Sequence, residues 1–119
     1  MLSHIFYSQL DPQWPASLSP QIAKNLLRKQ MQFNGLVLTD DLDMGAITRH
    51  YDIQTAVHQI LAADIDLTLI CHKGPNIEIA FEEIAKGAIS KSTLLTTDRL
   101  SSMCFIGNLM FARDVWTLD

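Results

Sequence analysis

The sequence predicts an α/β fold in which a parallel sheet is covered by helices. Residues 36–39 (LVLT) and 66–71 (DLTLIC) are short runs that read as apolar on both faces of a strand. Such runs are typical of parallel strands buried between helices. Segments with apolar residues at helical spacing separate the two runs. This alternation of strands and helices indicates a parallel α/β sheet.

The first third of the chain is expected to contain a strand, a loop and a helix. Residues 3–7 (SHIFY) have the composition of a short strand, and three prolines within residues 8–20 indicate a loop. Ser19 and Pro20 form a typical helix start. The apolar face of this helix is expected to consist of Ala23, Leu26, Leu27 and Met31. Asn34–Gly35 is expected to end it, because both residues tolerate a left-handed conformation.

Three more helices are expected in the remainder of the chain. Asp52 is expected to cap a helix over residues 53–64, and Gly74–Pro75 to begin the next helix. Their inward faces are expected to consist of Ile53, Val57, Ile60 and Leu61 in the first, and of Ile77, Ala80, Phe81, Ile84 and Ala88 in the second. Thr97 is expected to cap a last helix that runs to about Phe111.

Composition limits the class of protein. The 119 residues are enough for one domain at most, and 48% hydrophobic against 18% charged residues indicates an ordered chain. Nine basic and 13 acidic residues give a net charge of −4 without a basic cluster, so we expect no nucleic-acid partner. Neither a signal peptide nor a membrane span is recognisable, so we expect no membrane partner and a cytoplasmic location. Cys71 and Cys104 are expected to be reduced thiols in the core.

The strand over residues 36–39 ends in acidic residues, which is the first indication of function. Asp40, Asp41 and Asp43 follow it, and residues 41–50 are expected to form a loop with a short helical turn. In α/β folds the functional residues gather at the C-terminal ends of the strands. Asp40 is therefore the leading candidate for a catalytic residue.

Several short motifs occur in a fixed order along the chain. They are SHIFY followed by a proline-containing loop, the SLSP helix start, the TDDLDMGAI segment at residues 39–47 and the later AADIDLTLICH segment. Together these motifs resemble family 3 glycoside hydrolases, in particular the bacterial β-N-acetylhexosaminidase branch. The resemblance is strongest over residues 3–72.

The resemblance implies that residues 1–119 are part of the N-terminal-type domain of that family. The chain would be the C-terminal portion, about three β/α units, of a TIM-type (β/α)8 barrel whose N-terminal half is missing. The implied activity is that of a retaining glycosidase that cleaves terminal β-linked N-acetylhexosamine in a glycan or muropeptide, as in peptidoglycan recycling. Asp40 would be the nucleophile that forms a covalent glycosyl-aspartate. Because the acid/base loop of the family is absent, the chain alone is expected to be close to inactive.

Other residues are candidates through their positions. Met44 and His4 are candidate substrate-binding residues, although Met44 is equally consistent with core packing and His4 with a hydrogen-bonded core histidine. Asp41 is expected to cap the following turn or to orient Asp40. His72 ends the last strand, where it either borders the site or lies in a loop. No pair of histidines with a carboxylate has metal-ligand spacing, so neither a metal nor a cofactor is expected.

Two alternatives stay open at this point. Three predicted strands leave open sheet edges, so we expect self-association, and a non-catalytic, self-associating remnant of such a hydrolase is one alternative. The other is a receiver-like phosphoacceptor domain, because LVLTDDLDM (residues 36–44) is similar to the phosphoacceptor strand of receivers. The acidic pair that receivers carry after their first strand is absent here, since a single acid follows SHIFY.

Overall fold

The computed structural model describes residues 1–92, 103–106 and 110–112. The strands are β1 (Leu38–Asp41), β2 (Leu67–Leu69), β3 (Met103–Ile106) and β4 (Met110–Ala112). The helices are the 3-10 helix η1 (Ala16–Leu18), the π-helix η2 (Gln21–Gln30), and the α-helices α1 (Gly45–Thr48), α2 (Ile53–Ala63) and α3 (Pro75–Ser92). None of the described helices is both long enough and apolar enough to cross a bilayer.

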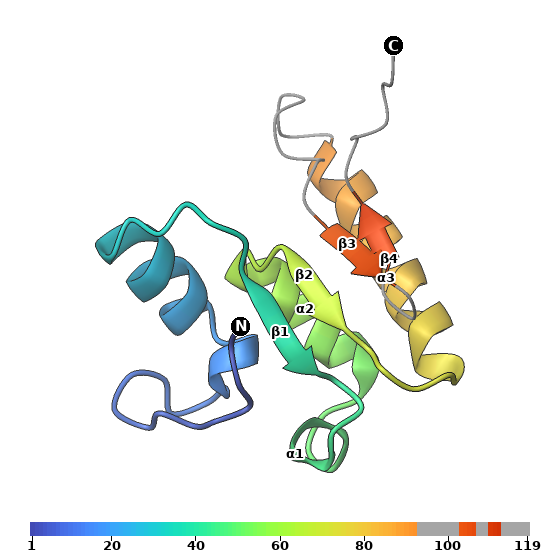
Figure 1. Ribbon diagram of the computed structural model, residues 1–119, viewed down its shortest axis with the longest axis horizontal. Coiled ribbons are helices and arrows are strands. Elements are labelled where there is room, and N and C mark those ends of the chain that lie inside the picture. The colour runs from blue at the N-terminus through green and yellow to red at the C-terminus, as the bar shows by residue number, and fades with distance from the viewer. Residues whose placement is uncertain (93–102, 107–109, 113–119) are drawn as a thin grey trace.

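The sheet has the strand order β1-β2-β3-β4, in which the first three strands are parallel and β4 is antiparallel (Figure 1). Leu2 extends it beyond β1 through an isolated parallel bridge with Thr39. The expectation of a strand over residues 3–7 is therefore wrong. The carbonyls of Ser3 and Ile5 instead accept hydrogen bonds from backbone amides in the η1 region, so this stretch is tied to a helix.

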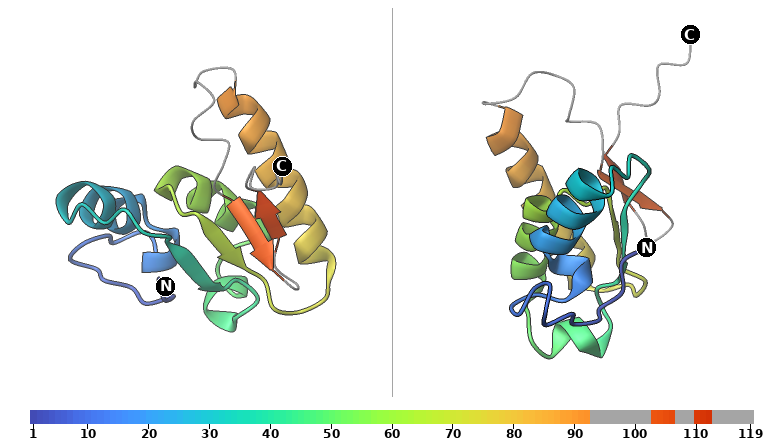
Figure 2. Two further views of the ribbon diagram at one scale, coloured as in Figure 1. Left: turned by 45° about the horizontal axis from the view of Figure 1, so that its top comes forward. Right: turned by 90° about the vertical axis from the view of Figure 1, so that its left-hand side faces the viewer.

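Helices cover one face of the sheet, and Figure 2 shows α2 and the η helices on the same side of the strands. Thr39 in β1 and Thr68 in β2 are buried, and so are Val37 and Ile70, which flank these strands. The alternate residues Leu38, Leu67 and Leu69 are only partly buried. The predicted parallel sheet covered by helices is confirmed for this face, and within the described residues no helix lies against the alternate face.

The helix that begins after Ser19 has an unexpected winding. Ser19 Oγ accepts a hydrogen bond from the amide of Ile22 (3.0 Å), which confirms its predicted capping role. The helix is a π-helix, and the amide of Met31 donates to the carbonyl of Leu26 five residues earlier (2.9 Å). This wider winding rotates late residues away from the predicted apolar face. Met31 is accordingly 65% exposed, and its prediction as a face residue is wrong.

Two non-glycine residues have a left-handed backbone, and each lies just past a helix. Gln32 has φ of 55°, so the chain leaves η2 earlier than the predicted Asn34–Gly35. Asp64 has φ of 60° at the C-terminus of α2. Aspartate tolerates this conformation better than most residues. The end of α2 therefore lies where the sequence predicts it.

The cap and most inward residues of α2 and α3 agree with the sequence. Asp52 accepts a hydrogen bond from the amide of Thr55 (2.7 Å) at the start of α2. The two helices share the core, which consists of Leu18, Ala23, Val37, Leu42, Ile47, Ala56, Val57, Ile60, Ala63, Ile65, Ile70, Ala80 and Ile84. Phe81 is an error in the predicted stripe, since it is 52% exposed. The side chain of Ala88 lies outside the described part of the chain.

The predicted helix from Thr97 to Phe111 is wrong where the structure describes it. Residues 103–106 and 110–112 form β3 and β4, while Thr97 itself lies outside the described residues. Cys104 pairs with Leu67 in the parallel ladder between β2 and β3. The backbone N–H and C=O groups along that edge of β2 thereby gain hydrogen-bond partners. These tertiary hydrogen bonds override the local helix preference of residues 103–106.

A buried carboxylate holds the proline-containing loop in shape. Asp11 accepts hydrogen bonds from the amides of Gln13 (2.9 Å) and Trp14 (3.1 Å) and from the hydroxyl of Ser19 (2.5 Å). Trp14 packs against Tyr51 with a ring-centroid distance of 5.1 Å. Burial by itself raises the pKa of Asp11, but these three hydrogen bonds outweigh it and hold the pKa below 3.8.

We predict that Asp11→Asn destabilises the chain by about 1–3 kcal/mol at pH 7, because the amide cannot accept all three hydrogen bonds. Because the pKa of Asp11 is lowered in the folded chain, the unfolded chain protonates this carboxylate at a higher pH than the folded chain does. The stabilisation from Asp11 is thus complete at neutral pH and is lost on acidification. Urea unfolding of both proteins between pH 3 and pH 7 should show their stabilities converging at low pH. A constant difference would contradict this assignment.

Candidate active site

Asp40 lies at the C-terminal end of β1 with a partly exposed side chain. Its amide donates to the carbonyl of Leu2 (2.9 Å), and its Oδ1 accepts a hydrogen bond from the amide of Asp41 (2.9 Å). Within the described ranges, no lysine, arginine or histidine forms an ion pair with Asp40. One carboxylate oxygen is therefore hydrogen-bonded to the backbone, and the other has no hydrogen-bond partner among the residues that the structure describes.

A β-bulge lies beside Asp40. Leu38 pairs with Leu67 and Asp41 pairs with Leu69, so β1 advances three residues while β2 advances two. The buried hydroxyl oxygen of Thr39 accepts the hydrogen bond of the Leu69 amide (3.1 Å). Bulges redirect neighbouring side chains and are frequent at active sites. Sequence periodicity missed this feature, because a bulge is defined only by the pairing of two strands.

Asp41 connects the ends of β1 and β2. Its Oδ1 accepts hydrogen bonds from the amides of Asp43 (3.1 Å) and Cys71 (3.0 Å). Asp43 in turn accepts a hydrogen bond from the side-chain amide of Asn76 at the start of α3 (2.8 Å). Asp41 thus bonds an amide of the turn before α1, but the prediction that it caps the helical turn is wrong, because the N-cap of α1 is Met44 and has no side-chain cap. The link to Cys71 is added by the fold.

His72 lies over the same two carboxylates. Its side chain is 77% exposed, and Nδ1 lies 3.7 Å from Oδ2 of both Asp41 and Asp43. One donor atom from each of the three residues lies within 4.8 Å of the other two. Imidazole and carboxylate are donors that zinc accepts, so among the described residues these three are the group that could hold a metal. The separations equally suit a protonated imidazole between two carboxylates. The sequence did not predict this group, because Asp41 and Asp43 follow one strand and His72 follows another, so no short spacing connects them.

Cys71 is exposed, so its prediction as a core thiol is wrong. Cys71 lies two residues after the C-terminal end of β2. Partial desolvation raises the pKa of Cys71 above 9.0, and the charges of Asp41, Asp43 and Asp40, together with a hydrogen bond to Asp41, raise it further. The side chain of Cys104 lies outside the described residues.

His4 and Met44 both contact the backbone carbonyl of Asp41. His4 Nε2 lies 2.8 Å from that oxygen and Nδ1 lies 2.6 Å from Oγ of Ser17. The amide of Met44 donates to the same carbonyl (3.1 Å), and its side chain is 45% exposed. The structure thus gathers both predicted substrate-binding residues near Asp40. Their contact with a sugar stays a prediction.

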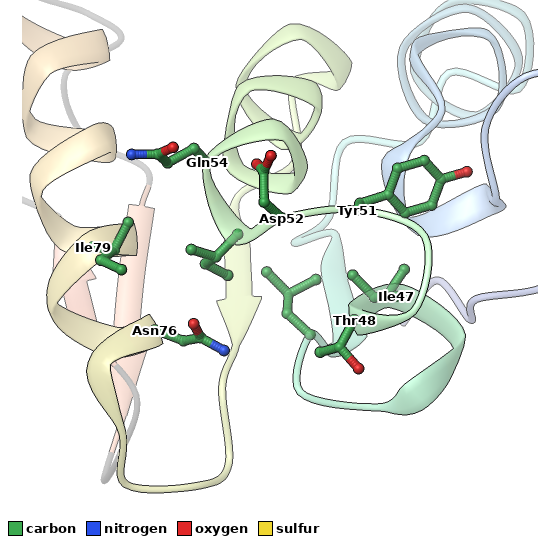
Figure 3. A pocket seen from close by; sticks show the side chains of 9 residues that line it. Ile47, Thr48, Tyr51, Asp52, Gln54, Asn76 and Ile79 are labelled. Atoms are coloured by element: carbon green, nitrogen blue, oxygen red, sulfur yellow. The ribbon is translucent and has the colours of Figure 1, made fainter.

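A cavity of 350 Å³ lies next to the acidic group, between α1, the start of α2 and the start of α3 (Figure 3). It is lined by Leu42, Ile47, Thr48, Tyr51, Asp52, Ile53, Gln54, Asn76 and Ile79. Asp40 does not line it, so the cavity and the strand-end acids are separate features. Asn76 joins them, because it lines the cavity and also binds Asp43.

Comparison with known proteins gives a consistent result. Residues 1–100 match the family model described as the glycosyl hydrolase family 3 N terminal domain. The beta-hexosaminidase of Pseudomonas aeruginosa is 31% identical over 103 residues, which is 87% of this chain and 29% of that protein. The matching model describes the N terminal domain of the family. The sequence predicted that the chain is the C-terminal part of the family's barrel, and this match does not show that.

Solved structures agree with this match. The beta-N-acetylglucosaminidase from Thermotoga maritima has a TM-score of 0.65 at 28% identity, over 76% of this chain and 20% of that chain. The beta-N-acetylhexosaminidase from Beutenbergia cavernae has a TM-score of 0.59 at 31% identity, over 76% of this chain and 26% of that chain. The chain thus spans less than a third of each of these relatives.

The raised pKa of Cys71 predicts slow alkylation by iodoacetamide at pH 8, because only the thiolate reacts. We expect Asp41→Asn to lower this pKa and to speed alkylation, since it removes the nearest negative charge. Rates measured against pH in a Cys104→Ser background would show the shift. Asp52→Asn, which removes a carboxylate from the cap of α2, should leave the rate unchanged. Equal rates in the Asp41→Asn and Asp52→Asn proteins would contradict the electrostatic cause.

Proposed function

Because the chain belongs to glycosyl hydrolase family 3, we propose that it is the nucleophile-bearing part of a retaining β-N-acetylhexosaminidase. The observation that carries this proposal is the placement of Asp40 at the end of β1, beside a bulge and with one carboxylate oxygen that has no partner within the described ranges. In a retaining mechanism such a carboxylate attacks the anomeric carbon as the bond to the leaving oxygen breaks. Water then hydrolyses the glycosyl-aspartate.

The remainder of the catalytic apparatus belongs to parts of the domain that this chain does not contain. A (β/α)8 barrel takes about 250 residues, and the parallel strands with helices on one face are suited to about three of its units. The partly buried leucines of the other face, Leu38, Leu67 and Leu69, are suited to a barrel interior. In this proposal the chain is the C-terminal portion of the barrel. Without the acid/base loop it is close to inactive alone.

The proposed substrate is a glycan or muropeptide with terminal β-linked N-acetylglucosamine. The names of the relatives support this choice, since they are beta-hexosaminidases and beta-N-acetylglucosaminidases. Peptidoglycan recycling in a bacterial cytoplasm is the setting that fits such a substrate. Membership of the family leaves the receiver-like alternative without support.

A chimera tests the role of Asp40. In it, the 103 residues aligned with the Pseudomonas aeruginosa beta-hexosaminidase replace the corresponding part of that protein. We expect the chimera to hydrolyse an aryl β-N-acetylglucosaminide. Asp40→Asn should reduce turnover by about 10⁴-fold or more, because the amide is a poor nucleophile. The 119-residue chain alone should show no turnover.

Asp52→Asn is the matched control for the chimera. It also exchanges a carboxylate for an amide, and asparagine retains the cap of α2. Its turnover should equal that of the parent chimera. Normal turnover in the folded Asp40→Asn chimera would reject Asp40 as the nucleophile.

The second candidate function, a self-associating module, rests on the apolar surface near the open sheet edge. Beyond the bridge at Leu2, the exposed large apolar residues of the N-terminal segment are Ile5, Phe6, Tyr7 and Leu10. Exposed apolar side chains close in sequence to a sheet edge favour association with another chain. A second copy of this chain is the partner in this proposal.

Sedimentation of the 119-residue chain tests the association. We expect a dimer or larger assembly at micromolar concentration, and Phe6→Ser should shift it toward the monomer because it removes apolar contact area. Phe81→Ser is the matched control, since Phe81 is also exposed but lies on α3. A wild-type chain that sediments as a monomer would count against self-association.

A further inference from the structure

The peptide bond between Asp41 and Leu42 is held on both sides. Its carbonyl accepts hydrogen bonds from Nε2 of His4 (2.8 Å) and from the amide of Met44 (3.1 Å). Its N–H, which belongs to Leu42, donates to the carbonyl of Leu69 in β2 (2.9 Å). Both the N–H and the C=O of this peptide are therefore hydrogen-bonded, and His4 supplies the side-chain partner.

The partners of His4 define its tautomer. A carbonyl only accepts hydrogen bonds, so Nε2 carries the proton that is donated to Asp41. In the neutral ring Nδ1 is then an acceptor, and it receives the hydroxyl hydrogen of Ser17 (2.6 Å). Ser17 is buried, and its own amide donates to the carbonyl of Ser3 (3.1 Å). Both ring nitrogens are thus engaged by the protein.

The peptide that His4 holds adjoins the one that holds Asp40. The amide of Asp41 donates to Oδ1 of Asp40 (2.9 Å), and the carbonyl of Asp41 accepts from His4. Both groups are bonded to the α-carbon of Asp41, so only the φ and ψ dihedrals of Asp41 separate the carbonyl that His4 restrains from the amide that binds Asp40. The amide of Asp40 is itself bound to the carbonyl of Leu2, two residues before His4.

We propose that His4 is a positioning residue for Asp40, which acts by holding the carbonyl of Asp41 so that the Asp41 amide stays directed at the Asp40 carboxylate. Ser17 supports it by keeping the Nε2–H tautomer. This assigns to His4 a role other than sugar contact, because neither ring nitrogen is left for a hydroxyl. The catalytic consequence rests on the proposed function, whereas the hydrogen-bond geometry does not.

The geometry is tested first in the 119-residue chain. We expect hydrogen exchange of the Asp41 amide to become about tenfold faster in His4→Ala, because its neighbouring carbonyl is released. His58→Ala is the matched control, since His58 is an exposed histidine on α2 that pairs with Glu83. Nitrogen NMR at pH 8 should show the Nε2–H tautomer for His4 and a mixture in Ser17→Ala. Unchanged exchange in folded His4→Ala, or an Nδ1–H tautomer, would overturn the proposal.

The consequence for catalysis is tested in the Pseudomonas aeruginosa chimera described above. We expect His4→Ala to lower kcat by about 10²-fold, because a small displacement of a reacting group costs about that much, while KM changes little. His4→Gln should recover part of kcat, since its amide can donate to the same carbonyl. A higher KM with unchanged kcat would indicate sugar contact and overturn the positioning role.

The two proposals fail in distinguishable ways. If Asp40→Asn inactivates the chimera but His4→Ala has normal kcat, the positioning role fails and the proposed function stands. If Asp40→Asn remains active while the exchange result holds, the proposed function fails and the hydrogen-bond geometry of His4 stands. His4→Gln guards against misfolding, because its thermal melt can be compared with that of the parent chain.

Discussion

The register of β1 against β2 is the constraint on which the remainder of the structure depends. The carboxylate of Asp66 accepts the amide hydrogen of Val37 (2.7 Å) and pairs with Arg28 from η2. The carbonyl of Val37 accepts in return from the amides of Asp66 (2.9 Å) and Leu67 (3.1 Å). A slip of one residue would exchange the two faces of the strand. The position of Asp40 at the far end of β1 therefore depends on this clamp.

From that fixed start, polar contacts build the open end of the sheet step by step. The hydroxyl of Thr39 accommodates the extra residue of the bulge, and the carboxylate of Asp41 then binds the end of β2 through Cys71. His4 adds the N-terminal segment to the same turn. Three segments that are distant in the sequence thus converge on the backbone around Asp40. Such support from neighbouring groups is what holds a reacting side chain in a defined geometry.

Local chemistry explains which elements could be predicted. The cap at Asp52 and the left-handed Asp64 depend on neighbouring residues alone, and both are where the sequence places them. The errors share a different cause. Met31 left the predicted face because the helix is wound as a π-helix, and Phe81 is exposed because its side of α3 has no partner within the described residues. The helix expected up to Phe111 gave way to strands, because Cys104 in β3 pairs with the distant Leu67 in β2.

The sequence by itself determined the α/β class, the main helix caps and the strand-end position of Asp40, since each follows from residues close together in the chain. Its motifs also identified the glycoside hydrolase family. Only the tertiary structure decided the bulge beside Asp40, the approach of His72 to the acids and the attachment of His4 to the Asp41 carbonyl. The physical reason is that each of these contacts joins residues from separate segments. Such contacts exist only once the register of the strands is set.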